Sequence, residues 1–174
     1  RFVFEKCTIK TFLRNNLVAK EGKPDPFEYF LLDGIFHAFS ITPEFEQVTT
    51  RLFLPTTVVT PHLVRTSETK SLQSLACLQD AVVAAIPVGE FSRLMREHPD
   101  LNAFGHKVVE RELTLKTQRE LDLLTRPARE RLIRFRNEYP NLENTIPLTV
   151  ISGFLGITPV SLSRLRNELA HSRS

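Results

Sequence analysis

The clearest pattern of apolar and polar positions lies near the C-terminus, from Ile146 to Leu169. A first amphipathic segment runs roughly from Leu148 to Leu155. Gly156 follows it, and a residue without a Cβ adopts the left-handed conformation that ends many helices. Thr158 is a suitable N-cap for a second helix, and Pro159 fits its first position because no N–H group is needed there. The pattern predicts two short helices joined by a tight turn.

The second of these helices is amphipathic. We expect its apolar residues to face a core: Val160, Leu162, Leu165 and Leu169. We expect its polar residues to point mostly away from that core: Ser161, Ser163, Arg164 and Asn167. A helix, a turn containing glycine and a second helix with a polar outer face are typical of a helix-turn-helix that reads DNA.

Short apolar segments separated by turn residues fill the N-terminal part of the chain, residues 1–95. Two aromatic-rich runs between Phe27 and Phe39 are interrupted by Asp33-Gly34, a dipeptide that favours the positive φ angles of a tight hairpin. Another apolar run, Ala81 to Ile86, follows a predicted turn at Gln79-Asp80. Several short strands at intervals of about ten residues favour a β-barrel or a sandwich.

A long helix is predicted from Asp100, as its N-cap, to about Leu124. Its apolar residues form two stripes, one with Leu101, Phe104, Val108 and Leu115 and the other with Val109, Leu113 and Leu124. Two stripes indicate contact with two partners, and a helix that lies only on its own barrel is the alternative. Glu112 and Arg119 interrupt the apolar pattern, which favours barrel contacts in addition to any coiled coil. Thr125 is predicted to cap a further helix that begins at Pro127.

Composition and charge narrow the classes of protein. The 174 residues are 41% hydrophobic and 25% charged, which is ordinary for a globular protein with a buried core. The net charge is +3, and from Arg126 onward 8 Lys and Arg residues stand against 4 Asp and Glu, whereas residues 1–125 have 15 against 16. The positive charge therefore accompanies the predicted reading helix, which suits a polyanionic partner.

Other sequence signals point to a cytoplasmic protein without a metal centre. No apolar run approaches the roughly 20 residues of a membrane span, and the first residues lack the apolar region of a secretory signal. The chain begins with Arg1 rather than Met, as a trimmed sequence would. Cys7 and Cys77 form no CxxC pattern, so we expect free thiols in a reducing cytoplasm rather than a disulfide, a zinc site or an iron–sulfur cluster. No pattern of catalytic residues stands out, so we expect no enzyme activity.

Two C-terminal stretches, GFLGITPVSLSRLRNELA and RPARERLIRFRNEYPNLENTIPLTVI, resemble the Crp/Fnr family of bacterial transcription regulators. The first is most similar to the branch whose recognition helix reads LGITPETLSRIRKKL. In the N-terminal half, EGKPDPFEYFLLDGIFHAF and SLQSLACLQDAVVAAIPVGEFSRLMREHPDL resemble two stretches of the family's barrel. The resemblance therefore covers nearly the whole chain.

The resemblance implies an α+β fold in three parts. Residues 1–99 would form an antiparallel β-barrel of the cyclic-nucleotide-binding-like jelly-roll type, which acts as a sensor. Residues 100–125 would form the helix that pairs with its twin in a dimer. Residues 126–174 would form a helical domain with a helix-turn-helix, winged or not.

The resemblance also implies a function. The chain would bind a near-palindromic operator in double-stranded DNA as a homodimer, with RNA polymerase as a further partner and no membrane contact. A signal at the barrel would change the dimer helix and the hinge near Thr125–Pro127. The alternative is a ligand-binding or protein-interaction module whose helical tail does not read DNA.

Arg164 matches the recognition-helix arginine of the family, and a guanidinium group can bind guanine O6 and N7 with two hydrogen bonds. The full set of predicted DNA-binding residues is Thr158, Ser161, Ser163, Arg164, Arg166 and Asn167. The chain departs from the branch at Val160, where relatives carry Glu; valine can only contact a thymine methyl group or face protein. Pro159 also removes a side-chain donor, so the operator sequence is open.

The predicted effector site departs from cyclic-nucleotide binders of the family, which use a Gly-Glu pair and an arginine for the phosphate. Pro55 to Ser71 contains no glycine, and the arginine position falls at Ser71 or Leu72. Arg65, Lys70 and Ser71 are the candidate effector-binding residues. We therefore expect no cofactor and no cyclic AMP, and either another small molecule or no ligand. His37, His62 and Cys7 could ligate haem in principle, but their spacing indicates ordinary core or surface residues.

Overall fold

The computed structural model describes residues 3–44, 46–59 and 70–171. After a short 3₁₀ turn at Phe4–Lys6, the described strands form two four-stranded sheets, ordered β1-β8-β3-β6 and β2-β7-β4-β5. The strands are β1 (Thr8–Phe12), β2 (Leu17–Ala19), β3 (Phe27–Asp33), β4 (Phe36–Ile41), β5 (Gln47–Phe53), β6 (Val58–Val59), β7 (Ser74–Cys77) and β8 (Ala81–Pro87). All pairings among the described strands are antiparallel, and the inner faces enclose a core that includes Tyr29, Phe36 and Val83. The expected antiparallel barrel is confirmed.

The expected hairpin at Asp33-Gly34 is wrong in one respect. Gly34 does have a positive φ of 90°, and an added Cβ would lie 2.4 Å from the carbonyl oxygen of Asp80. However, β3 pairs with β8 and β6, whereas β4 pairs with β5 and β7 in the other sheet. The turn therefore carries the chain from one sheet to the other instead of joining two paired strands.

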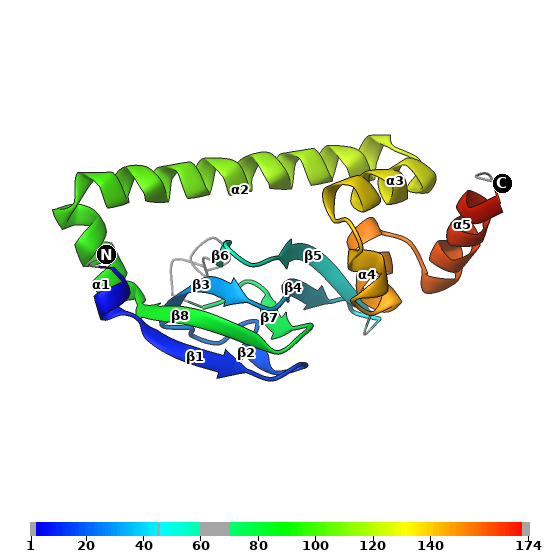
Figure 1. The fold of residues 1–174 in the computed structure, drawn as a ribbon. Helices are drawn as coiled ribbons and strands as arrows, with labels where there is room; N and C mark the ends of the chain where they lie inside the picture. Colours follow the sequence, from blue (N-terminus) through cyan, green and yellow to red (C-terminus); the bar gives the residue numbers. More distant parts are fainter. Residues whose placement is uncertain (1–2, 45, 60–69, 172–174) are drawn as a thin grey trace.

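Two helices lead away from the barrel. α1 (Val88–Glu97) packs Phe91 and Leu94 against Ile86 of β8, and Leu101 at the start of the next helix joins the same cluster. α2 (Pro99–Thr125) has 27 residues and lies along the barrel, with α1 near one end and the C-terminal helices near the other (Figure 1). It begins at Pro99, so Asp100 lies in its first turn rather than at the N-cap.

The C-terminal part comprises α3 (Ala128–Glu138), a 3₁₀ turn at Leu142–Asn144, α4 (Leu148–Leu155) and α5 (Pro159–His171). Thr125 does not cap α3: its hydroxyl donates to the carbonyl oxygen of Leu121 within α2, and Pro127 occupies the N-cap position. Within the described ranges no single helix has the length and apolar composition of a membrane span, and α4 with α5 meets that composition only as a pair bent by 94°.

One continuous hydrophobic core joins the barrel to the C-terminal helices. It contains Ile35, Leu52 and Leu78 from the barrel together with residues such as Phe135 of α3 and Leu162 of α5. α4 lies directly against β5, at the position of Gly153, where an added Cβ would be 2.9 Å from the carbonyl oxygen of Gln47. The helix and the strand therefore approach each other too closely at this point for a side chain at position 153.

Candidate DNA-binding interface and the adjoining cavity

The turn between α4 and α5 has the geometry expected from the sequence. Gly156 has a φ of 64° and ends α4, and the amide of Ile157 donates to the carbonyl oxygen of Ser152 at 3.0 Å. The Thr158 hydroxyl accepts the amide hydrogen of Ser161 at 3.1 Å, which is an N-cap bond, and Pro159 is the first residue of α5. Since α4 and α5 are bent by 94°, the pair has the angle of a helix-turn-helix.

The outer face of α5 is polar except at its N-terminal end. Ser163, Arg164 and Asn167 are exposed, whereas Leu162 and Leu169 are buried in the shared core. The expectation that Val160 faces the core is wrong, because its side chain is 61% exposed. Residues two apart on an α-helix point in nearly opposite directions, so Val160 and Leu162 cannot face the same core.

The hydroxyl groups at the start of α5 are hydrogen-bonded to each other and to the backbone, and they keep further donor and acceptor capacity. Thr158 Oγ1 and Ser161 Oγ lie 3.0 Å apart, in addition to the N-cap bond between these residues. Both are close to the helix N-terminus, where free amides and the helix dipole favour a phosphate. Their contacts with DNA stay a prediction.

Most arginines of this region have partners inside the protein. Arg136 and Arg166 both bind Glu143, and their hydrogen bonds and charges lower its pKa in spite of partial burial. Arg166 thus holds α5 against the 3₁₀ turn before α4, while any DNA contact by it stays a prediction. Arg129 and Arg164 are exposed, and among the described residues neither forms an ion pair.

The junction between α2 and α3 is braced by a second set of bonds. Asp122 of α2 forms ion pairs with Arg126 at 2.7 Å and with Arg134 of α3 at 3.0 Å. Arg131 donates to the carbonyl oxygens of Arg126 and of Leu155, at the end of α4. The predicted hinge is therefore tied both to α2 and to the helix-turn-helix.

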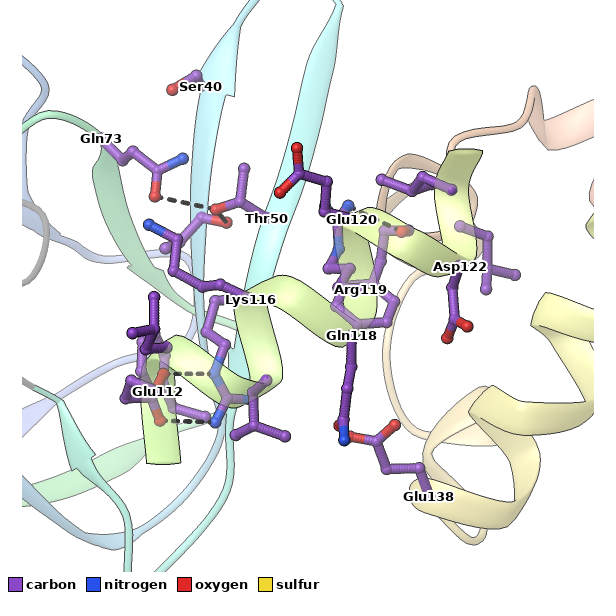
Figure 2. A pocket seen from close by; sticks show the side chains of 18 of the residues that line it. Ser40, Thr50, Gln73, Glu112, Lys116, Gln118, Arg119, Glu120, Asp122 and Glu138 are labelled. Carbon is purple, nitrogen blue, oxygen red and sulfur yellow. Dashed lines mark hydrogen bonds and ion pairs between the residues drawn. The ribbon is translucent and has the colours of Figure 1, made fainter. Parts of the chain in front are cut away.

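Arg119 connects three elements. From α2 its guanidinium group donates to the carbonyl oxygens of Thr49 in β5 and Phe154 in α4, both at 2.9 Å, and its carbon Cζ lies 4.9 Å from the Phe154 ring centroid. Figure 2 shows Arg119 on α2 among the side chains that line the adjoining cavity. Burial, helped by the charge of Arg131, lowers the pKa of Arg119. Barrel, long helix and helix-turn-helix thus meet at one side chain.

A buried ion pair joins β5 to α2. Arg51 donates from Nε and Nη2 to the two carboxylate oxygens of Glu112, each at 2.9 Å, and from Nη1 to the carbonyl oxygen of Leu52 (Figure 2). Burial opposes the charged form of Arg51, but the bond to Glu112 and its charge hold the pKa above the ordinary value. Glu112 and Arg119, which interrupt the apolar pattern of α2, are therefore its barrel contacts.

A cavity of about 790 Å³ lies between the barrel, α2 and α3. Its barrel wall combines apolar residues such as Phe53 and Val59 with the neutral polar residues Ser40, Thr50 and Gln73 (Figure 2). Asp25, which is buried and accepts a hydrogen bond from the Tyr29 hydroxyl, also lines it. The described part of the wall contains no glycine. Charged side chains of α2 also line the cavity, among them Lys116, Arg119 and Glu120, so its wall offers both cations and carboxylates to a ligand.

The predicted effector residues do not come together around this cavity within the described ranges. Ser71 is buried, and its backbone bonds to Gly22 and Lys23. Lys70 is exposed beside Pro24, and Arg65 lies outside the described residues. Gln73, two residues after Ser71, does line the cavity with its polar side chain.

The candidate haem ligands have ordinary environments. His37 is buried, its Nδ1 lies 3.2 Å from Thr49 Oγ1, and burial lowers its pKa to about 4. Burial raises the pKa of the Cys7 thiol, and His62 lies outside the described residues. Burial and then the charge of Asp80 raise the pKa of Cys77 to about 11. Both cysteines are free, and the part of the chain that the structure describes holds no cluster of three or more metal-ligating side chains.

No protein-family model matches the chain, and no curated protein sequence matches it. Among solved structures it is similar to FixK2 from Bradyrhizobium japonicum, with a TM-score of 0.84, 15% identity and coverage of 95% of this chain and 85% of that one. The c-di-GMP responsive global regulator CLP of Xanthomonas campestris gives a TM-score of 0.76 at 12% identity, covering 98% of this chain and 89% of that one. A transcriptional regulator assigned to the Crp/Fnr family, from Eubacterium rectale, gives a TM-score of 0.78 at 10% identity, covering 97% of this chain and 80% of that one. The chain therefore has the fold of these regulators, from the barrel to the helix-turn-helix.

Proposed function

We propose that this chain is a DNA-binding transcription regulator of the Crp/Fnr type. The observation that carries the proposal is the exposed face of α5, where Arg164 stands without an ion pair among the described residues at the outer side of a helix-turn-helix. The structural similarity to FixK2 and to the global regulator CLP also supports a role in transcription regulation. Residues Ser163, Arg164 and Asn167 would contact the major groove, with Thr158, Ser161 and Arg166 nearer the backbone.

The proposed regulator acts as a homodimer. Val109, Leu113 and Leu124 form a stripe of α2 that lies about 60–120° around the helix from Glu112. The stripe borders the cavity, and Leu113 and Leu124 are 65% and 76% exposed. Pairing of this stripe with a second copy would bury it. The dimer would place its two α5 helices in successive major grooves, about 34 Å apart, which suits a near-palindromic operator.

Replacing both Leu113 and Leu124 by Lys is expected to weaken dimerisation by at least about tenfold, since each leucine buried at an interface contributes more than about 1 kcal/mol. Sedimentation velocity over a range of protein concentrations measures the dissociation constant. The matched control replaces two exposed barrel leucines, Leu17 and Leu32, by Lys. An equal effect of both double variants would contradict the proposed interface.

Replacing Arg164 by Ala is expected to lower specific DNA binding by about 1–3 kcal/mol, because two hydrogen bonds to a guanine are lost. Operator duplexes selected from a random pool, titrated with wild type and variant, measure the change. Arg96→Ala removes an exposed arginine from α1, near the opposite end of α2 from α5, and serves as the control (Figure 1).

The same titrations at several salt concentrations separate the two classes of function. A DNA reader releases counterions, so its affinity falls steeply as salt rises. Shallow salt dependence together with unchanged discrimination in Arg164→Ala would favour a module that binds a ligand or a protein instead. The cavity is the observation that favours this second candidate.

The proposed sensor takes a small molecule other than cyclic AMP, and no resident cofactor. The absence of glycine from the described cavity wall supports this, since no glycine there frees backbone amides for a cyclic phosphate. Two cations of the wall, Arg51 and Arg119, are already bound to Glu112 and to the carbonyl oxygens of Thr49 and Phe154. Titration calorimetry with cyclic AMP is expected to give no heat of binding at millimolar concentration. Saturable binding that is abolished by Arg51→Met or Arg119→Met would overturn the expectation.

A further inference from the structure

The N-terminal turn of α5 presents an apolar group to the solvent. Val160 is 61% exposed, and Pro159 beside it is exposed and has no N–H group. The two hydroxyl groups of the same turn, on Thr158 and Ser161, lie 3.0 Å apart and serve the N-cap. Within this turn Val160 therefore presents exposed methyl groups beside the exposed but hydrogen-bonded hydroxyl group of Thr158.

Val160 shares the outer face of α5 with Arg164. The two residues are four apart, so they lie one above the other on a helix. In a helix-turn-helix the N-terminal residues of the second helix contact base edges in the major groove. Val160 therefore stands on the side of α5 that would face the bases, nearer the helix start than Arg164.

The major groove offers one apolar group to such a side chain. Guanine, adenine and cytosine present hydrogen-bond donors and acceptors there, and thymine adds its 5-methyl group. A valine opposite any other base edge would leave a polar group without its water. A methyl group buried against Val160 would instead favour binding by about fourfold.

We infer that each operator half-site carries a thymine whose 5-methyl group packs against Val160. Four residues of α-helix span about 6 Å, which is about two base-pair steps of DNA. The thymine therefore lies within about two base pairs of the guanine bound by Arg164. This inference rests on the proposed function and adds a base preference to it.

Selection of duplexes from a random pool by the wild-type chain identifies the half-site, and deoxyuridine then replaces each selected thymine in turn. At one position per half-site the loss of the methyl group is expected to weaken wild-type binding by about fourfold. Val160→Ser is expected to bind the thymine and deoxyuridine duplexes equally. Arg164→Ala is expected to lose the guanine preference while keeping the thymine-to-deoxyuridine ratio.

The outcomes separate the two levels of the argument. The inference would be overturned if the wild type bound thymine and deoxyuridine duplexes equally at every position, or if Val160→Ser kept the full effect of the methyl group. In either case, loss of the guanine preference in Arg164→Ala would still support DNA reading. Selection of no sequence at all would overturn the proposed function, and the inference with it.

Discussion

Replacing Glu112 by Ala is expected to lower the free energy of unfolding by about 3 kcal/mol, because it leaves Arg51 buried without its carboxylate. Glu112 is 7% exposed and forms two hydrogen bonds to Arg51 at 2.9 Å. We expect a loss of stability at the lower end of the range for buried ion pairs. The Arg51 side chain is 17% exposed and would keep its hydrogen bond to the carbonyl oxygen of Leu52.

Urea unfolding at one protein concentration measures the loss. The double variant Arg51→Met with Glu112→Leu is the matched control, because it removes both charges and keeps the volume. It is expected to be more stable than Glu112→Ala. If Glu112→Ala unfolds at the same urea concentration as wild type, the ion pair contributes nothing to the attachment of α2.

Replacing Phe135 by Ala is expected to lower the free energy of unfolding by about 3–5 kcal/mol, since it opens a large cavity in a packed core. Phe135 is 2% exposed and contacts the rings of Tyr139 and Phe154. Its core also contains Leu52 of the barrel, so barrel and C-terminal helices are expected to unfold together.

Ile133→Ala is the control for this variant, because Ile133 lies on the same helix with 36% of its surface exposed. Circular dichroism and tyrosine fluorescence followed through the same urea titration test the joint unfolding. Equal losses in both variants, or two separate transitions in the wild type, would contradict the single core.

Local signals explain what the sequence could predict of the fold. Gly156, Thr158 and Pro159 act on their immediate neighbours, and the predicted turn agrees with the observed one. The Asp33-Gly34 turn was equally visible, but strand pairing depends on partners about fifty residues away, β8 among them. Sequence patterns therefore locate strands better than they pair them.

The site shows the same division. The outward face of α5 could be predicted from helical spacing. Strict use of the same spacing would also have placed Val160 on the exposed face rather than in the core. The contacts of Arg51 with Glu112, and of Arg119 with Thr49 and Phe154, join residues 35 to 70 positions apart. The interrupted apolar pattern at Glu112 and Arg119 indicates contact with the barrel, but nothing near them in the sequence identifies the residues that they meet.

The close approach at Gly153 bears on how a signal could reach DNA. With α4 in backbone contact with β5 and tied to it through Arg119, the helix-turn-helix has little freedom to tilt on its own protomer. In the proposed dimer each protomer would act as one rigid arm, and α2, at 27 residues, is about 40 Å long. A pivot of only about 5° at one end of such an arm displaces the other end by about 3.4 Å, which is one base-pair step. We therefore expect small rotations of whole protomers, rather than bending at Thr125–Pro127, to set the spacing of the two recognition helices.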